Sequence, residues 1–97
     1  MKVKLENELL QEYEERAKVF KAMAHPTRLF ILEQLNEKSL CVCEITELID
    51  ADMSTISKHL SVLKNANLVK SSKKGLQVFY TLAAPCVLTT SKCLKSQ

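Results

Sequence analysis

The sequence predicts a mainly α-helical domain of about five helices with one two-stranded β-hairpin between the last two. Two patterns predict this fold class. Apolar residues recur at spacings of three and four over most of the chain, which is the period of an amphipathic helix. Around the only glycine, Gly75, the pattern changes to β-branched and aromatic residues, which is typical of a hairpin. Because the chain has 97 residues, we treat 1–97 as a single domain.

The first half of the chain is predicted to form three helices. Pro26 begins the second, which ends near Asn36, because the missing N–H of proline is not needed in a first turn. After a short link over 39–43, a third helix of two turns covers 44–49. The first helix, residues 5–23, has an apolar stripe that needs a partner surface, and a dimer interface is a good candidate: Leu5, Leu9, Tyr13, Ala17, Phe20 and Met23.

A fourth helix is predicted over 53–67. Asp52 is placed to cap it, since its carboxylate lies near the N–H groups of Ser54 and Thr55. Together with the short helix before it, this segment forms a helix-turn-helix candidate. The residues expected to face the core are Ile56, Leu60, Leu63 and Ala66.

The remaining elements complete a winged helix-turn-helix. Residues 68–72 and 76–82 are predicted to be the two strands of the hairpin, the wing, with its turn at Lys74 and Gly75. A final helix begins at residue 84 or 85 and reaches about Leu94.

Charge is distributed unevenly along the chain. Residues 1–52 carry seven Lys and Arg against eleven Asp and Glu, whereas residues 53–97 carry seven Lys and no acidic residue. A half that contains only positive charge favours binding to a polyanion such as nucleic acid. No apolar leader or membrane-length run is visible, so we expect a cytosolic protein without a membrane partner.

Short polar and basic side chains cover the outer face of the fourth helix and the tip of the hairpin. These groups suit phosphate contacts and base-edge hydrogen bonds in a major groove of double-stranded DNA. A lysine-rich ribbon beside such a helix suits the DNA backbone or the minor groove. The predicted DNA-binding residues are Ser54, Thr55, Ser57, Lys58, His59, Ser61, Lys64, Lys73 and Lys74.

Three blocks of the chain resemble the ArsR/SmtB family of metal-responsive winged helix-turn-helix repressors. They are residues 21–29 (KAMAHPTRL), residues 54–63 (STISKHLSVL) and the strand that ends at Leu82. The resemblance covers roughly residues 15–85. It implies a homodimer joined by the first and last helices, an inverted-repeat operator, and release from that operator by an inducer.

Residues 40–44 (LCVCE) resemble the block that opens the third helix in arsenite- and cadmium-type members. Two thiolates, Cys41 and Cys43, bind soft ions well, so As(III), Cd(II), Pb(II) or Zn(II) is the implied inducer. Positions i and i+2 of a regular helix are about 200° apart. The two sulfurs therefore converge only if the pair lies at the start of the helix or the helix distorts.

This chain departs from the family pattern in its further ligands. Thr46 stands where arsenite-type members carry a third cysteine, and the N-terminal arm has none of the cysteines of cadmium-type members. The last helix lacks the Asp and His of the zinc-type site. Further ligands would come from Cys86, Cys93, a histidine or solvent.

Packing is favoured over function for Cys86 and Cys93, which lie about 10.5 Å apart if both are on the last helix. His25 is expected to be a cap or core residue, and His59 a DNA contact or a packed side chain.

Two other interpretations of the chain stay open. In a cytosolic chain the four cysteines are not expected to form a structural disulfide framework, but a redox-responsive repressor that forms a disulfide or persulfide is an alternative. A winged-helix module that binds protein rather than DNA is another. The sequence has no phosphate loop, no paired catalytic carboxylates and no Cys-x-x-Cys, so we expect no enzymatic activity.

Overall fold

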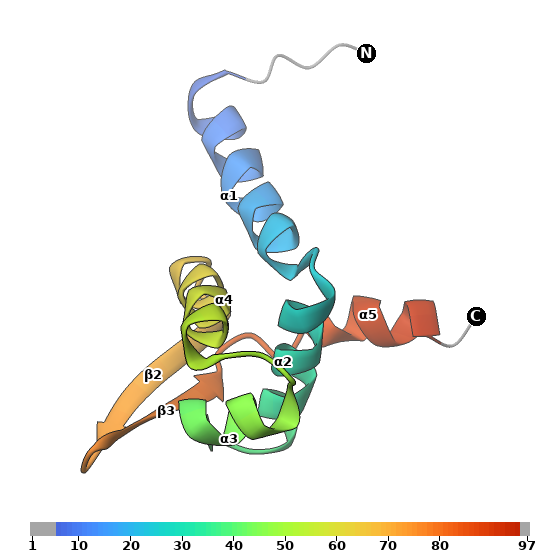
Figure 1. Cartoon of the computed structure of the whole chain (residues 1–97). Coiled ribbons are helices and arrows are strands. Elements are labelled where there is room, and N and C mark those ends of the chain that lie inside the picture. Colours follow the sequence, from blue (N-terminus) through green and yellow to red (C-terminus); the bar gives the residue numbers. More distant parts are fainter. Residues whose placement is uncertain (1–5, 96–97) are drawn as a thin grey trace.

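The computed structural model describes residues 6–95, and within that range the predicted order of elements is confirmed (Figure 1). Leu5, which the sequence places in the first helix, lies outside the described residues. The elements are α1 (Asn7–Met23), α2 (Pro26–Glu37), β1 (Leu40–Cys41), α3 (Val42–Leu48), α4 (Met53–Asn65), β2 (Val69–Lys74), β3 (Gln77–Leu82) and α5 (Val87–Lys95).

The hairpin of β2 and β3 is confirmed, and its register runs from Val69 opposite Leu82 to Lys74 opposite Gln77. Gly75 adopts a φ of +63°, a left-handed conformation that glycine takes without steric conflict. The prediction of a two-stranded sheet is incomplete, however. The strand order is β1-β3-β2, so β3 is central and the very short β1 pairs with its other edge.

The sequence treats β1 as a link because two residues are too short to display strand alternation. Its pairing with a distant strand makes it β-structure: Leu40 lies opposite Tyr80 and Cys41 opposite Phe79. This pairing brings the start of α3 against the wing, since Val42 follows β1 directly.

The core lies between α2, α3, α4 and the sheet, and α5 adds Leu88 from the other side (Figure 1). In contrast, α1 extends away from this body, and only Ala22 and Met23 at its end are buried. The fully buried large side chains are Ile31, Leu32, Ile45, Ile56, Leu60, Leu63, Leu68 and Leu88.

The last helix begins later than predicted. The amides of Val87, Leu88 and Thr89 each bond to a carbonyl three residues earlier, so the chain makes tight turns before the regular helix begins at Val87. Cys86 therefore lies before α5 rather than on a shared helical face with Cys93. Within residues 6–95, no helix is long and apolar enough to cross a membrane.

Candidate nucleic-acid interface and cysteine site

The turn between α3 and α4 is organised by Asp52, as predicted. Its Oδ1 accepts hydrogen bonds from the Thr55 backbone N–H at 2.8 Å and from the Ser54 hydroxyl at 2.9 Å. Hydrogen bonds from the backbone and the side chain of Thr55, followed by the one from the Ser54 side chain, hold the pKa of Asp52 below its ordinary value of 3.8. This cap sets where α4 starts, and it engages the hydroxyl of Ser54 before any DNA is present.

One face of α4 is buried. Ile56, Leu60 and Leu63 are 0% exposed and attach the helix to the core. The exposed surface of α4 carries hydroxyls and ammonium groups, together with two large apolar side chains, Met53 and Val62. The predicted residues of α4 that are exposed are Ser54, Thr55, Ser57, Lys58, Ser61 and Lys64.

His59 is the exception among the predicted contacts on α4. Its ring centroid lies 4.5 Å from that of His25, and its Nδ1 lies 3.3 Å from Nη1 of Arg28. Burial, followed by the proximity of His25 and Arg28, lowers the pKa of His59 from 6.5. The side chain faces α2, which supports the packing interpretation over a base contact.

His25 is the N-cap of α2, which is one of the two roles, cap or core, expected for it. Its Nδ1 accepts a hydrogen bond from the Thr27 N–H at 3.1 Å. The neighbouring Arg28 donates from Nε to the carbonyl oxygen of Ala22 at 2.6 Å, so its guanidinium ties the end of α1 to α2 and α4.

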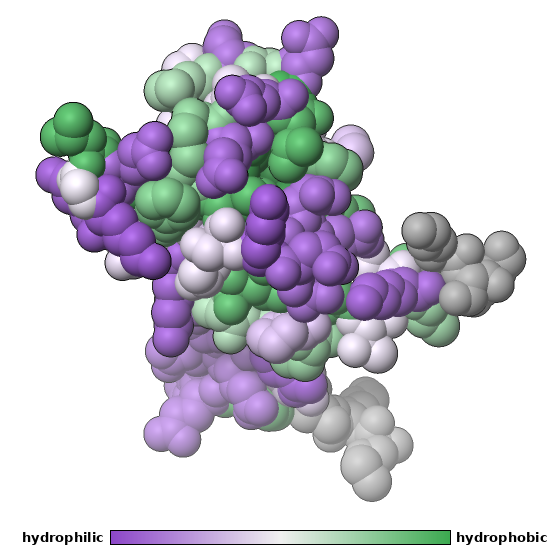
Figure 2. Space-filling view, turned by 90° about the horizontal axis from the view of Figure 1, so that it is seen from below, coloured by the Kyte–Doolittle hydropathy of each residue, from purple (hydrophilic) through white to green (hydrophobic). Residues whose placement is uncertain are grey.

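The hairpin projects from the body as an arm with mostly hydrophilic side chains, seen at the left of Figure 2. Lys73 and Lys74 are exposed near its tip, next to Leu76, which is 100% exposed. Lys74 Nζ lies 5.6 Å from the centroid of the Phe79 ring. Lys64 Nζ donates to the Ser71 hydroxyl at 2.7 Å and so links α4 to β2. Helix and wing thus form one basic surface.

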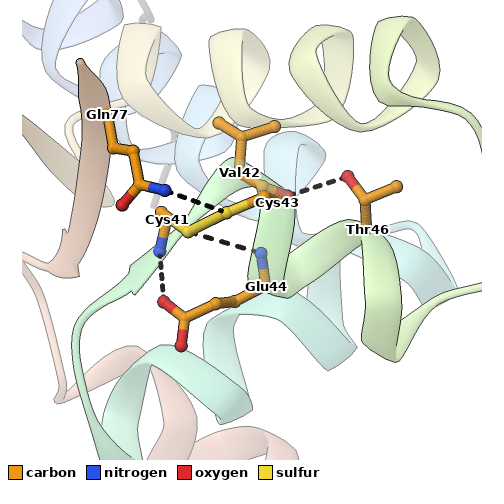
Figure 3. The surroundings of a disulfide bond; sticks show 6 residues. All are labelled: Cys41, Val42, Cys43, Glu44, Thr46 and Gln77. Atoms are coloured by element: carbon orange, nitrogen blue, oxygen red, sulfur yellow. Dashed lines mark hydrogen bonds between the residues drawn. A yellow bond between two sulfur atoms is a disulfide. The ribbon is translucent and has the colours of Figure 1, made fainter.

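A second site lies at the start of α3, where Cys41 and Cys43 are joined in a disulfide (Figure 3). Cys41 is the N-cap residue, in an extended conformation with φ −84° and ψ 165°. Cys43 lies in the first helical turn. The two sulfurs converge because the pair lies at the helix start, which is one of the two arrangements that the spacing of the cysteines allows.

A capping box surrounds the pair. The Glu44 N–H donates to Cys41 Sγ at 3.4 Å, and Glu44 Oε1 accepts from the Cys41 N–H at 3.0 Å. Glu44 is not among the residues predicted from the sequence, although its position three residues after the cap is the spacing that finds such a box. Thr46, in place of a third cysteine, donates its hydroxyl to the Val42 carbonyl at 2.8 Å.

The wing also reaches the cysteine pair. Gln77 Nε2, at the start of β3, donates to Cys43 Sγ at 3.7 Å (Figure 3). No local pattern points to Gln77, because 34 positions separate the two residues in the chain.

The other thiols are not brought to this site. Cys86 and Cys93 are free and exposed, so neither of them packs within one chain. Among residues 6–95, no group of three or more His, Cys, Asp or Glu side chains is arranged to hold a metal ion. The described part of one chain therefore offers two sulfur ligands and no third ligand from these residue types.

Comparison with known proteins identifies the family of this fold. The family model of the bacterial regulatory protein, arsR family, matches residues 25–71, from the cap of α2 into β2. The chain is 46% identical over 72 residues to the HTH-type transcriptional regulator MJ1325 of Methanocaldococcus jannaschii, a match that covers 73% of this chain and 81% of that protein. The chain belongs to the arsR family.

Other relatives extend this arsR-family assignment. The arsenical resistance operon repressor of Bacillus subtilis is 39% identical over 77 residues, which are 78% of this chain and 70% of that protein. A cadmium resistance regulatory protein of Staphylococcus aureus is 43% identical over 67 residues, or 68% of this chain and 55% of that protein. The solved structure of HlyU from Vibrio cholerae N16961 has a TM-score of 0.80 at 30% identity and covers 89% of this chain and 97% of its own.

These relationships confirm the predicted fold and class of protein. This arsR-family member is a transcriptional regulator with a winged helix-turn-helix DNA-binding fold, and it is not an enzyme. Its helix-turn-helix is α3 and α4, and its wing is β2 and β3.

Proposed function

We propose that this protein is a homodimeric repressor that leaves its inverted-repeat operator when a soft metal or metalloid ion binds the thiolates of Cys41 and Cys43. The observation that carries the proposal is the convergence of the two sulfurs at the N-terminus of α3, the helix that leads directly into α4. The names of the arsenical and cadmium resistance relatives support this choice of inducer.

Ion capture begins from the reduced pair. A reductant supplies two electrons and two protons to open the disulfide, and the two thiols then lose their protons as their sulfurs bind the ion. As(III), Cd(II), Pb(II) and Zn(II) all accept thiolate ligands. With two protein sulfurs, solvent or a residue of a second copy completes the coordination.

Binding at this position acts on the helix cap. Cys41 Sγ accepts the Glu44 N–H, so an ion that takes this sulfur competes with a hydrogen bond of the first turn of α3. Because α3 and α4 are joined only by residues 49–52, a shift of α3 moves the helix that reads DNA. In this proposal, α4 is placed differently in the ion-bound and ion-free states, and this difference releases the protein from its operator.

The homodimer is supported by the unpartnered face of α1. Tyr13 and Phe20 are 48% and 63% exposed on a helix that extends from the body. A second copy would cover this face and supply the second α4 for the other half of an inverted repeat.

The test is fluorescence anisotropy on duplex DNA from upstream of the gene, with protein reduced by a phosphine. The ion-free protein is titrated at several salt concentrations, and the ion titrations are made at one of them. We expect tight, salt-dependent binding that near-stoichiometric arsenite or Cd(II) reverses. Cys41→Ser with Cys43→Ser should bind DNA and lose this response, whereas Cys86→Ser with Cys93→Ser should keep it. Normal release from the first double variant contradicts ion sensing at this pair. Weak, salt-insensitive association contradicts DNA repression and favours a protein-binding module.

The disulfide favours a second candidate, a repressor that responds to oxidation. Here the two thiols of Cys41 and Cys43 lose two electrons and two protons to an oxidant such as a diazene, which is reduced to the hydrazine. The same DNA experiment distinguishes the two candidates. Release by diazene with no effect of arsenite or Cd(II) supports redox control, and unchanged DNA affinity after complete oxidation contradicts it.

A further inference from the structure

Gln77 connects the cysteine pair to the wing through a side-chain contact. It is the first residue of β3, and its amide points from the strand toward the disulfide (Figure 3). Nε2 donates to Cys43 Sγ at 3.7 Å. On the other side of the hairpin, Gln77 is paired with Lys74, one of the basic residues near the tip. One residue thus lies between the cysteine site and the basic end of the wing.

A second connection runs through the backbone. Cys41 lies opposite Phe79 in the β1–β3 ladder, two residues along the strand from Gln77. The ladder holds β1 to the wing whatever the state of the sulfurs, because it uses backbone groups. The Gln77 hydrogen bond differs in this respect, since its acceptor is the reactive sulfur itself.

We propose that Gln77 is a positioning residue that couples the chemical state of Cys43 to the placement of the wing on DNA. This inference rests on the proposed function of the cysteine pair. It adds a route to DNA that is separate from the path through α3 and α4, and Gln77 itself binds no ion.

The physical basis is the strength of the sulfur as a hydrogen-bond acceptor. In the structure, Cys43 Sγ accepts this hydrogen bond as the neutral sulfur of a disulfide. A sulfur that binds an ion as a thiolate carries negative charge, and hydrogen bonds to charged groups are roughly twice as strong as neutral ones. Gln77 is exposed, so water competes for its amide more effectively when Cys43 is a neutral acceptor.

The wing is the element on which this difference acts. The β2–β3 arm projects from the body, and beyond Gln77 it continues only into the turn. When a bound ion strengthens the Gln77 hydrogen bond, the segment that carries Lys73 and Lys74 is held more firmly toward the cysteine site. We therefore expect the wing to adjust to DNA best when no ion is bound to Cys43.

The experiment compares the full-length protein with Gln77→Met, which keeps the side-chain length and removes the N–H donor. Thr81→Val is the matched control, because it alters an exposed polar residue of the same strand away from the cysteines. For each, Cd(II) binding is followed by thiolate–cadmium absorption, and operator affinity is measured with and without Cd(II).

We expect all three proteins to bind Cd(II) with the same stoichiometry. The ratio of ion-free to ion-bound DNA affinity should be several-fold smaller in Gln77→Met than in wild type, within the range of about 5- to 150-fold typical of coupled sites. Thr81→Val should match wild type. An unchanged ratio in Gln77→Met overturns the role of Gln77 and leaves the proposed function in place. If wild-type protein binds DNA and is not released by Cd(II), the proposed function fails, and this inference fails with it.

A second measurement needs no DNA. In ¹⁵N-labelled protein, the side-chain amide resonances of Gln77 should move when Cd(II) binds, while those of Gln11 on α1 stay in place. Resonances of Gln77 that do not respond to a stoichiometric ion overturn the hydrogen bond on which the inference depends.

Discussion

The His59 imidazole lies against the ring of His25, and its Nδ1 accepts a hydrogen bond from Arg28. Because arginine only donates, this hydrogen bond requires that Nδ1 of His59 carries no proton. His25 Nδ1 accepts the Thr27 N–H that caps α2. A proton at Nδ1 of His59 removes an acceptor and adds a positive charge beside Arg28. Both rings belong to the junction that holds α4 against α2.

This junction predicts a pH dependence of stability. The pKa of His59 is lower in the folded protein than its ordinary 6.5, so the unfolded chain binds the proton more tightly. The contribution to stability is fully present above pH 6.5 and is lost as the pH falls through the folded pKa. The free energy of unfolding, measured with urea, should therefore decrease from pH 7.5 to pH 5.

His59→Asn provides the control, since the amide oxygen takes the place of Nδ1 as acceptor for Arg28 and does not titrate. We expect a flatter stability profile over the same pH range in this variant. Identical profiles for the wild type and His59→Asn would show that His59 does not carry the effect.

At the scale of elements, α4 and the wing act as one surface because they are joined twice. Leu63 and Leu68 place the end of α4 and the start of the hairpin in one core, and Lys64 bonds to Ser71 across the outside. The exposed lysines of both elements are positioned by this joint. Each lysine that contacts a phosphate should add to the salt dependence of binding.

Replacement of Lys73 and Lys74 by alanine should weaken binding to all DNA sequences alike. The slope of log affinity against log salt concentration should become shallower by about one for each phosphate that the variant no longer neutralises. Anisotropy titrations at four or five salt concentrations measure this slope. Lys92→Ala on α5, away from the wing, is the control and should leave the slope unchanged (Figure 1).

At the scale of the whole molecule, α1 is an incomplete element. A helix that extends from the body with Leu10, Tyr13 and Phe20 exposed does not bury its own apolar stripe. Most helical stability in proteins comes from packing of such a stripe rather than from propensity. The proposed second copy supplies the missing surface.

Phe20→Glu should therefore convert the dimer to a monomer and weaken operator binding, because a carboxylate at an apolar interface loses its hydration. Sedimentation velocity measures the mass, and anisotropy measures the affinity. Gln11→Glu adds the same charge on the opposite face of α1, since nine residues make two and a half turns. A dimer that survives Phe20→Glu would contradict an interface on this face.

The sequence by itself determined the order of the helices, the hairpin at Gly75 and the cap at Asp52. These features are short-range, since helical period, turn and cap each depend on residues within a few positions of one another. The resemblance of a few sequence blocks was also sufficient for the family.

Only the tertiary structure decided the strand β1, the direction of His59 and the hydrogen bond of Gln77 to Cys43. The last two join residues 31 and 34 positions apart, and β1 exists through pairing with a strand far along the chain. Tertiary packing brings such distant residues together, and a pattern of neighbouring residues in the sequence cannot predict these pairs. The same holds for Cys86, which tight turns before α5 leave outside the helix.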